Sequence, residues 1–133
     1  MKIRVIIAGS RDFADYSFLE NVLDDFFSEH IHNEDDEIAI VSGGARGADE
    51  LGIRYAKEKY IPLKVFRADW NTHGRSAGYI RNGTMLNYIT EPDCKGYVIA
   101  FWDGKSKGTA HMIKIAKKAN IDVIVKIILK KLE

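Results

Sequence analysis

The sequence predicts an α/β protein in which helices flank a mostly parallel sheet of about five strands. Short apolar runs alternate with amphipathic stretches along the whole chain, and such strand–helix–strand successions form parallel strands with right-handed crossovers. The first run, 3–8, is almost continuously apolar, which is typical of a strand covered on both faces. At 133 residues the chain has the usual size of one domain, so we expect a single domain over 1–133.

The later elements are predicted from local patterns. After strand 3–8 we expect, in chain order, helix 17–30, strand 38–41, helix 45–59, strand 63–66, loop 67–75, helix 76–89, strand 97–102, loop 103–109, a helix to about 119, and strand 122–129. The first helix carries an apolar stripe at spacings of three and four residues, and Ser17 and Glu20 at its start have the spacing of a capping box. Pro62 precedes the third strand, and Pro92 ends the helix before the fourth.

Composition and charge narrow the classes of function. The formal net charge of +1 gives no overall field that would recruit nucleic acid by charge alone. The single cysteine, Cys94, excludes an internal disulfide and fits a reducing compartment, so we expect a cytoplasmic protein. No apolar run reaches the ~18 residues that span a bilayer, and the charged start of the chain does not resemble a signal peptide, so we expect no membrane partner.

Polar chemistry collects at the ends of the expected strands. Loops 9–12, 42–47 and 103–109 each come directly after a strand, and together they hold six of the eleven glycines. Four of the seven arginines fall in these loops or in the segment 74–81, namely Arg11, Arg46, Arg75 and Arg81. Ligands of parallel sheets bind outside the carboxyl ends of the strands, and guanidinium groups match phosphate oxygens in pairs. We therefore expect an anionic or nucleotide ligand at this edge.

The loop 42–47 is the strongest of these signals. An apolar strand stops at Ser42, glycines come next, and a helix of small residues begins. The backbone N–H groups of 43–46 and the positive end of the helix dipole would then hold a phosphate, assisted by Arg46. The other interpretation is a glycine turn that only packs a helix against the sheet. Neither the Walker pattern nor the dinucleotide fingerprint is present, since Gly104-Lys105-Ser106 matches only the end of the former.

The remaining polar and aromatic residues allow several roles. Arg81 shares a helix face with Gly78 and Met85, where it would either contact the ligand or form a surface ion pair. Trp70 and Trp102 have rings that could stack on a base, although Trp102 could equally be buried. Asp69 or Asp103 could accept hydrogen bonds from ribose hydroxyls. His111 could bond the ligand, act as an acid or base, or have only a packing or surface role. His30 and His32 do not share a helix face, so we expect no metal site.

Taken together, the motifs resemble the SLOG superfamily, and among its branches the small YspA/YpsA-related proteins. The segments that carry the resemblance are Gly9-Ser10-Arg11, the run 42–49, the block 69–85 and the run 101–109. The resemblance covers nearly the whole chain. It implies a Rossmann-like three-layer fold and a site for nucleotides or nucleotide-derived ligands.

Relatives in that superfamily suggest two further functions. LOG enzymes cleave the N-glycosidic bond of cytokinin nucleotides; Arg81, Met85 and Gly108-Thr109 match their motifs, but Met112 stands where their catalytic Glu is expected. Hydrolysis here would need a non-standard group, drawn from Asp49, Asp69, Asp103 or His111. The DNA-processing protein DprA suggests an accessory role in nucleic-acid handling, for which the lysines of 105–118 would supply a basic stripe or merely a solvated face.

The leading prediction is a small cytosolic protein that binds a nucleotide or nucleotide-derived molecule, with no required cofactor and no metal. A homodimer is one expected assembly, because related proteins often dimerise. For the hydrolase alternative, the predicted catalytic residues are Arg81 and Asp103. The predicted ligand-binding residues are Gly9, Ser10, Arg11, Ser42, Gly43, Gly44, Ala45, Arg46, Gly47, Asp49, Asp69, Trp70, Arg81, Asn82, Trp102, Asp103, Gly104, Lys107, Gly108 and Thr109.

Overall fold

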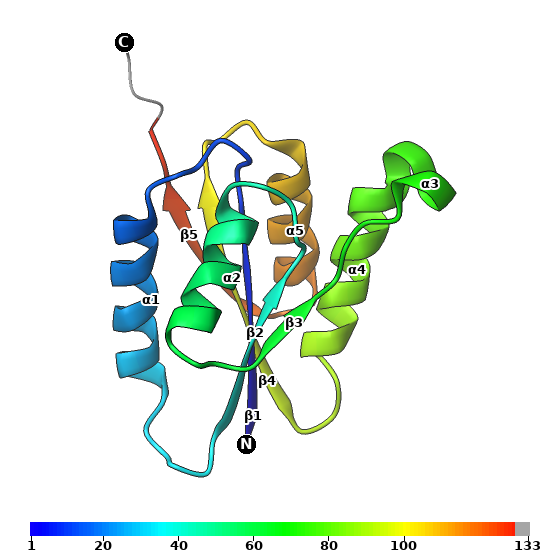
Figure 1. The fold of residues 1–133 in the computed structure, drawn as a ribbon. Coiled ribbons are helices and arrows are strands. Elements are labelled where there is room, and N and C mark those ends of the chain that lie inside the picture. The colour runs from blue at the N-terminus through cyan, green and yellow to red at the C-terminus, as the bar shows by residue number, and fades with distance from the viewer. Residues whose placement is uncertain (130–133) are drawn as a thin grey trace.

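The computed structural model describes residues 1–129 and consists of one five-stranded parallel sheet with helices on both faces (Figure 1). This arrangement confirms the predicted α/β class and the parallel sheet. The strands are β1 (Lys2–Gly9), β2 (Glu37–Ser42), β3 (Leu63–Val65), β4 (Cys94–Trp102) and β5 (Asp122–Ile127). The helices are α1 (Tyr16–His30), α2 (Ala48–Glu58), α3 (Trp70–His73), a 3-10 turn η1 (Gly74–Ser76), α4 (Ala77–Ile89) and α5 (Lys107–Lys118).

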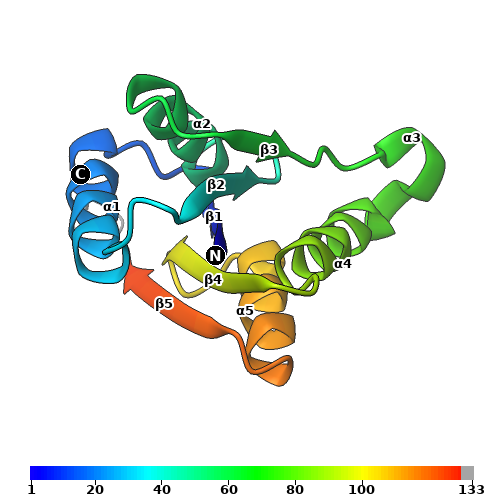
Figure 2. The same ribbon diagram turned by 90° about the horizontal axis from the view of Figure 1, so that it is seen from below.

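The strand order places a crevice at the carboxyl edge of the sheet. The order is β3-β2-β1-β4-β5, and every neighbouring pair is parallel. The chain thus proceeds outward from β1 to β3 and then returns to the other side of β1 to form β4. Helices α1 and α2 cover one face and α4 and α5 the other (Figure 2). The reversal next to β1 is where doubly wound sheets bind their ligands.

The core confirms that the first strand is covered on both faces. Val5 and Ile7 pack in the cluster under α1 and α2, whereas Ile6 and Ala8 pack in the cluster under α4 and α5. All four side chains are buried. The opposite orientation of successive residues along a strand therefore lets β1 contribute to two separate cores.

The start of α1 differs from its prediction. Asp15 is the N-cap residue, and its side chain accepts a hydrogen bond of 3.1 Å from the backbone N–H of Phe18. Ser17 already lies in the first turn, so the predicted capping box of Ser17 and Glu20 is wrong. A carboxylate is as good a cap as a hydroxyl, and the apolar stripe alone does not fix which of two nearby polar residues begins the helix.

Three further boundaries differ in ways that matter for the site. Helix α2 begins at Ala48 rather than at 45, because the backbone of Gly47 has a φ of +82° that a helix cannot contain. The predicted loop 67–75 contains α3 and η1, and α3 is capped by Asp69, whose carboxylate accepts from the N–H of Thr72. Helix α5 begins at Lys107, inside the predicted loop 103–109. Over the described part of the chain, no helix is long and apolar enough to cross a membrane.

Candidate functional site

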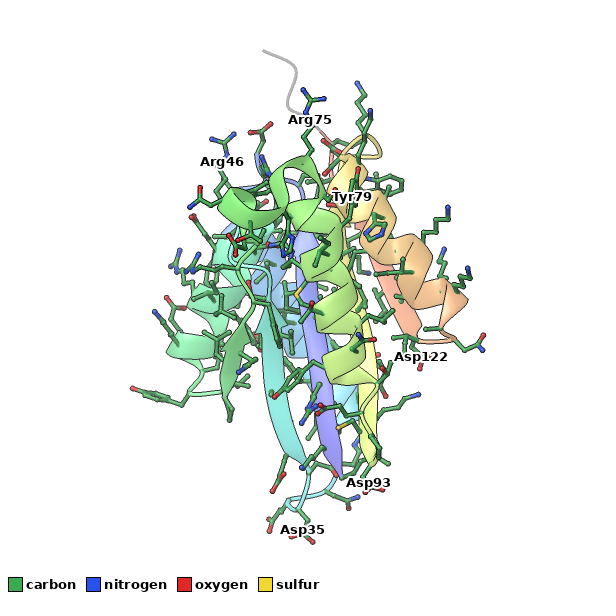
Figure 3. The ribbon with its side chains drawn as sticks, turned by 90° about the vertical axis from the view of Figure 1, so that its right-hand side faces the viewer. Asp35, Arg46, Arg75, Tyr79, Asp93 and Asp122 are labelled. Atoms are coloured by element: carbon green, nitrogen blue, oxygen red, sulfur yellow. The ribbon has the colours of Figure 1, made fainter. Side chains whose placement is uncertain are left out.

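Two adjoining cavities lie at the carboxyl edge beside β1. The inner cavity, about 310 Å³, lies between α4, α5 and the β2–α2 loop. The outer cavity, about 730 Å³, extends from the same loop toward α3. Arg11, Ala45 and Arg81 line both cavities, which therefore meet at these residues. In Figure 3 the labelled Arg46 lies at this end of the molecule, and Asp35 and Asp93 lie at the opposite end.

The first turn of α5 forms one wall of the inner cavity. Ser106, Lys107, Gly108 and Thr109 line it, and no acceptor among residues 1–129 bonds the backbone N–H groups of 107, 108 and 109. Nothing lies within 4 Å of the position that a Cβ of Gly108 would take, so the space beside this residue is open. Free first-turn amides combined with the positive helix end favour a bound anion.

The β2–α2 loop is closed by its own hydrogen bonds. The N–H of Gly44 donates to Ser42 Oγ at 3.2 Å, and the N–H of Ala45 donates to Asp49 Oδ2 at 3.1 Å. These two amides therefore have internal acceptors, whereas the prediction assigns them to a phosphate. The N–H groups of Gly43 and Arg46 have no acceptor within the described residues. This loop thus leaves fewer donors for an anion than its sequence predicts, and α5 provides a better set.

Asp49 is a buried carboxyl group on the wall of the inner cavity. The residue is 6% exposed. Burial raises the pKa of Asp49 to about 6, although the N–H of Ala45 and the charges of Arg81 and Arg11 oppose the rise. Its Oδ2 accepts from Ala45, whereas Oδ1 makes no hydrogen bond within residues 1–129 and is not sealed from the cavity. The site therefore contains a carboxyl group that changes charge near neutral pH.

Arg81 and Asn82 connect the β2–α2 loop, α4 and α5 through hydrogen bonds. Arg81 Nη1 donates to the carbonyl oxygen of Gly43 at 2.5 Å, and its Nε donates to Asn82 Oδ1 at 3.2 Å. Asn82 Nδ2 lies 3.1 Å from both the Gly108 carbonyl oxygen and His111 Nδ1. This chain of contacts links the β2–α2 loop, α4 and the first turn of α5. Burial lowers the pKa of Arg81 and Asp49 raises it, but a guanidinium group stays charged in proteins.

Four arginines face the two cavities without a carboxylate partner. They are Arg11, Arg46, Arg67 and Arg81. None forms an ion pair with an Asp or Glu of residues 1–129, whereas Arg4 and Arg54, far from this edge, pair with Glu91 and Glu58. Arg67 donates to the carbonyl oxygen of Gly44 at 2.8 Å and is the one member of the set that the sequence interpretation missed. The sequence feature that could have indicated Arg67 is its position just beyond the third strand, at the same edge of the sheet.

The structure brings together thirteen of the predicted ligand-binding residues at the two cavities and leaves seven elsewhere. Those on the inner cavity are Gly9, Arg11, Ala45, Asp49, Arg81, Asn82, Lys107, Gly108 and Thr109. Those that line only the outer cavity are Gly43, Gly44, Arg46 and Trp70. Those that line neither are Ser10, Ser42, Gly47, Asp69, Trp102, Asp103 and Gly104.

Several of the predicted residues that line neither of these two cavities form hydrogen bonds within the protein or line a third cavity. Asp103 Oδ1 accepts from the N–H groups of Lys105 and Ser106, each at 2.8 Å, and these bonds lower the pKa of Asp103. Trp102 Nε1 donates to the carbonyl oxygen of Ser106 at 3.0 Å. Ser10 and Asp103 line a different cavity of about 850 Å³ beside α1. The two predicted catalytic residues, Arg81 and Asp103, thus lie on different cavities.

The sheet order and the two helix layers define a Rossmann-like α/β protein. The chain belongs to the YspA, cpYpsA-related SLOG family, whose model matches residues 3–73. It is also 36% identical over 126 residues to the Gene 61 protein of Mycobacterium phage D29, an alignment that covers 91% of this chain and 94% of the phage protein. The resemblance found in the motifs is thereby confirmed.

Proposed function

We propose that this protein binds a nucleotide or nucleotide-derived ligand at the carboxyl edge of the sheet, with a phosphate in the inner cavity. The observation that carries the proposal is the open first turn of α5, where the N–H groups of 107–109 border the same cavity as Arg11 and Arg81. Backbone amides and guanidinium groups are the donors that phosphate groups use most in proteins. Membership of the SLOG family supports a nucleotide as the bearer of that phosphate.

The outer cavity supplies a surface for the rest of the ligand. Trp70 lines it and is 50% exposed, so one part of its indole ring is available for contact. Aromatic rings stack on any base because every base has a π-face. A nucleotide whose phosphate lies against α5 would extend past Arg81 toward Trp70.

Calorimetric titration of the protein with nucleoside monophosphates, diphosphates and ADP-ribose tests this proposal. The informative variant is Gly108→Asp, which places a carboxylate in the open space before the α5 amides. We expect it to weaken binding by more than about tenfold, because like charges repel within a partly buried cavity. Gly83→Asp is the matched control, since Gly83 also lies on a helix with nothing within 4 Å of its Cβ position and lines neither cavity. Equal affinity in both variants would contradict the phosphate position.

Asp49 favours a second candidate function, hydrolysis of the N-glycosidic bond of a nucleotide. Its carboxyl group is buried beside the proposed phosphate, and a pKa of about 6 suits a general acid or base near neutral pH. Met112 stands where the LOG enzymes carry a catalytic Glu, and it lines the same cavity as Asp49. In this protein the carboxyl group in the cavity would therefore come from Asp49 and not from the position of Met112.

Release of free base, measured by chromatography on the nucleotides that bind, separates this candidate from binding alone. We expect Asp49→Asn to abolish release while binding persists, because the amide can still accept from Ala45 but cannot exchange a proton. Asp103→Asn tests the other predicted catalytic carboxylate. Loss of turnover in Asp103→Asn, with turnover kept in Asp49→Asn, would assign the reaction to Asp103 instead.

The basic stripe expected for a DprA-like role receives no specific support. Lys105, Lys114, Lys117 and Lys118 are exposed and line neither cavity; Lys107 alone among these lysines borders the inner one.

A further inference from the structure

We infer that the ligand carries two phosphoryl groups, one in each cavity. This inference rests on the proposed function and specifies the class of nucleotide that the site accepts. Its first basis is the charge of the walls. Arg11, Arg46, Arg67, Arg81 and Lys107 line the two cavities, and Asp49 is their one acidic residue. A chain with a formal net charge of +1 thus concentrates positive charge at one site.

The second basis is that none of these arginines forms an ion pair within residues 1–129, although the charge of Asp49 acts on Arg81 and Arg11. Arginines elsewhere in the molecule pair with glutamates, as Arg4 and Arg54 do. At the site, the internal hydrogen bonds of Arg67 and Arg81 go to carbonyl oxygens, which orient the guanidinium groups without neutralising them. Four unneutralised guanidinium groups around adjoining cavities repel one another, and a bound polyanion relieves that repulsion.

The third basis is the number of oxygens. One terminal phosphate offers three strong acceptor oxygens and a charge of about −1.5 to −2. Three α5 amides together with Arg11 and Arg81 already satisfy such a group in the inner cavity. Arg46, Arg67 and the N–H of Gly43 then remain on the outer cavity. They have the donors for a second phosphoryl group, and Arg11 and Arg81, which border both cavities, would lie between the two.

A direct test uses inorganic probes, because these need no knowledge of the base. The full chain is titrated with orthophosphate and with pyrophosphate at pH 7.5. We expect pyrophosphate to bind at least about tenfold more tightly, a difference of about 1.4 kcal/mol. Each nucleoside monophosphate is then compared with its diphosphate, and the same preference is expected for the base that the protein selects.

The outer-cavity arginines decide where the second group binds. Arg46→Ala and Arg67→Ala should each reduce pyrophosphate affinity by about fivefold or more and leave orthophosphate affinity within about twofold. Arg75→Ala is the matched control, because Arg75 lies at the same end of the molecule (Figure 3) and lines neither cavity. Arg46 makes no internal hydrogen bond within residues 1–129, so its variant tests the inference even if Arg67→Ala disturbs the loop.

Two phosphoryl groups occur both in diphosphate-bridged nucleotides and in consecutive nucleotides of a short oligonucleotide. ADP-ribose and the dinucleotide pTpT therefore form separate arms, and tighter binding of one identifies the source. Equal affinity for mono- and diphosphates, with nucleotides still bound, would overturn the inference but leave the proposed function intact. If no phosphate or nucleotide binds at all, both fail.

Discussion

Replacement of Asp49 by Asn should change how the stability of the protein depends on pH. Asp49 has a raised pKa of about 6 in the folded state against 3.8 for the free side chain. The folded state therefore binds more protons than the unfolded state between about pH 4 and pH 6, and the free energy of unfolding falls as pH rises through that window. Two pKa units correspond to roughly 3 kcal/mol. Since Asp49 is 6% exposed, solvent screening reduces this figure little.

The Asn variant keeps the acceptor for the Ala45 N–H but cannot titrate, so it should lack this pH-dependent loss. Urea unfolding of both proteins at half-unit steps from pH 4 to 7.5 gives the difference in unfolding free energy. We expect that difference to move in favour of Asp49→Asn by roughly 2.5 kcal/mol between pH 4 and pH 7, since part of the full effect lies below pH 4. The other carboxyl groups are common to both proteins and cancel.

A difference that stays constant across the range would refute the reasoning. It would mean that the carboxyl group ionises normally despite its burial, because Arg81 and Arg11 compensate fully. The acid–base role proposed for Asp49 would then lose its physical basis. Asp103→Asn provides the opposite sign: the pKa of Asp103 is lowered by the N–H groups of Ser106 and Lys105, so its contribution to stability is present above the unfolded pKa and is lost as pH falls.

Three further predictions, one of them with a control substitution, concern the site and the loops beside it. Arg81→Ala should weaken nucleotide binding by about 1–3 kcal/mol in calorimetry, the range for a charge-assisted hydrogen bond; unchanged affinity would remove it from the site. Gly47→Ala should lower the unfolding free energy by more than about 3 kcal/mol, because a Cβ would lie 2.3 Å from the Ser10 carbonyl oxygen at a φ of +82°. Gly74→Ala, at a φ of +55° but with nothing within 4 Å, should cost only the backbone strain, and a comparable loss would contradict the steric argument. Asn82→Leu should cost about 1–3 kcal/mol in urea unfolding, since the bonds between α4 and α5 are lost; a neutral effect would show that this link is dispensable.

The sequence predicts the sheet well because its signals are local. The apolar run 3–8 indicates a strand buried on both faces, and the alternation of strands and helices leaves few topologies with right-handed crossovers. The edge that carries the candidate site is predicted by the same argument. Boundaries were less predictable where a single backbone torsion decides them, as at Gly47, whose φ of +82° delays the start of α2.

Which residues line each cavity could not be predicted, because this depends on where each side chain points, and the sequence pattern does not give that direction. Ser10 and Arg11 are neighbours in the chain, yet Ser10 lines the cavity beside α1 and Arg11 the two on the other side. Asp49 was assigned to the ligand, but its side chain also folds back to bond Ala45, which no spacing rule indicates. Arg67 lies just beyond a strand of only three residues, and so short a strand is a weak signal for a functional loop after it.

The position of β1 has a consequence for how the chain folds. This strand pairs with β2 on one side and with β4 on the other, where Lys2 lies opposite Cys94. During synthesis its second edge therefore stays unpaired until some ninety further residues have emerged, and non-local pairings of this kind form slowly. A nascent chain ending near residue 73 would also leave Ile6 uncovered, because α4 and α5 bury that face. An N-terminal fragment of this length should accordingly self-associate, and the intact protein should acquire its resistance to proteolysis only after β4 is complete.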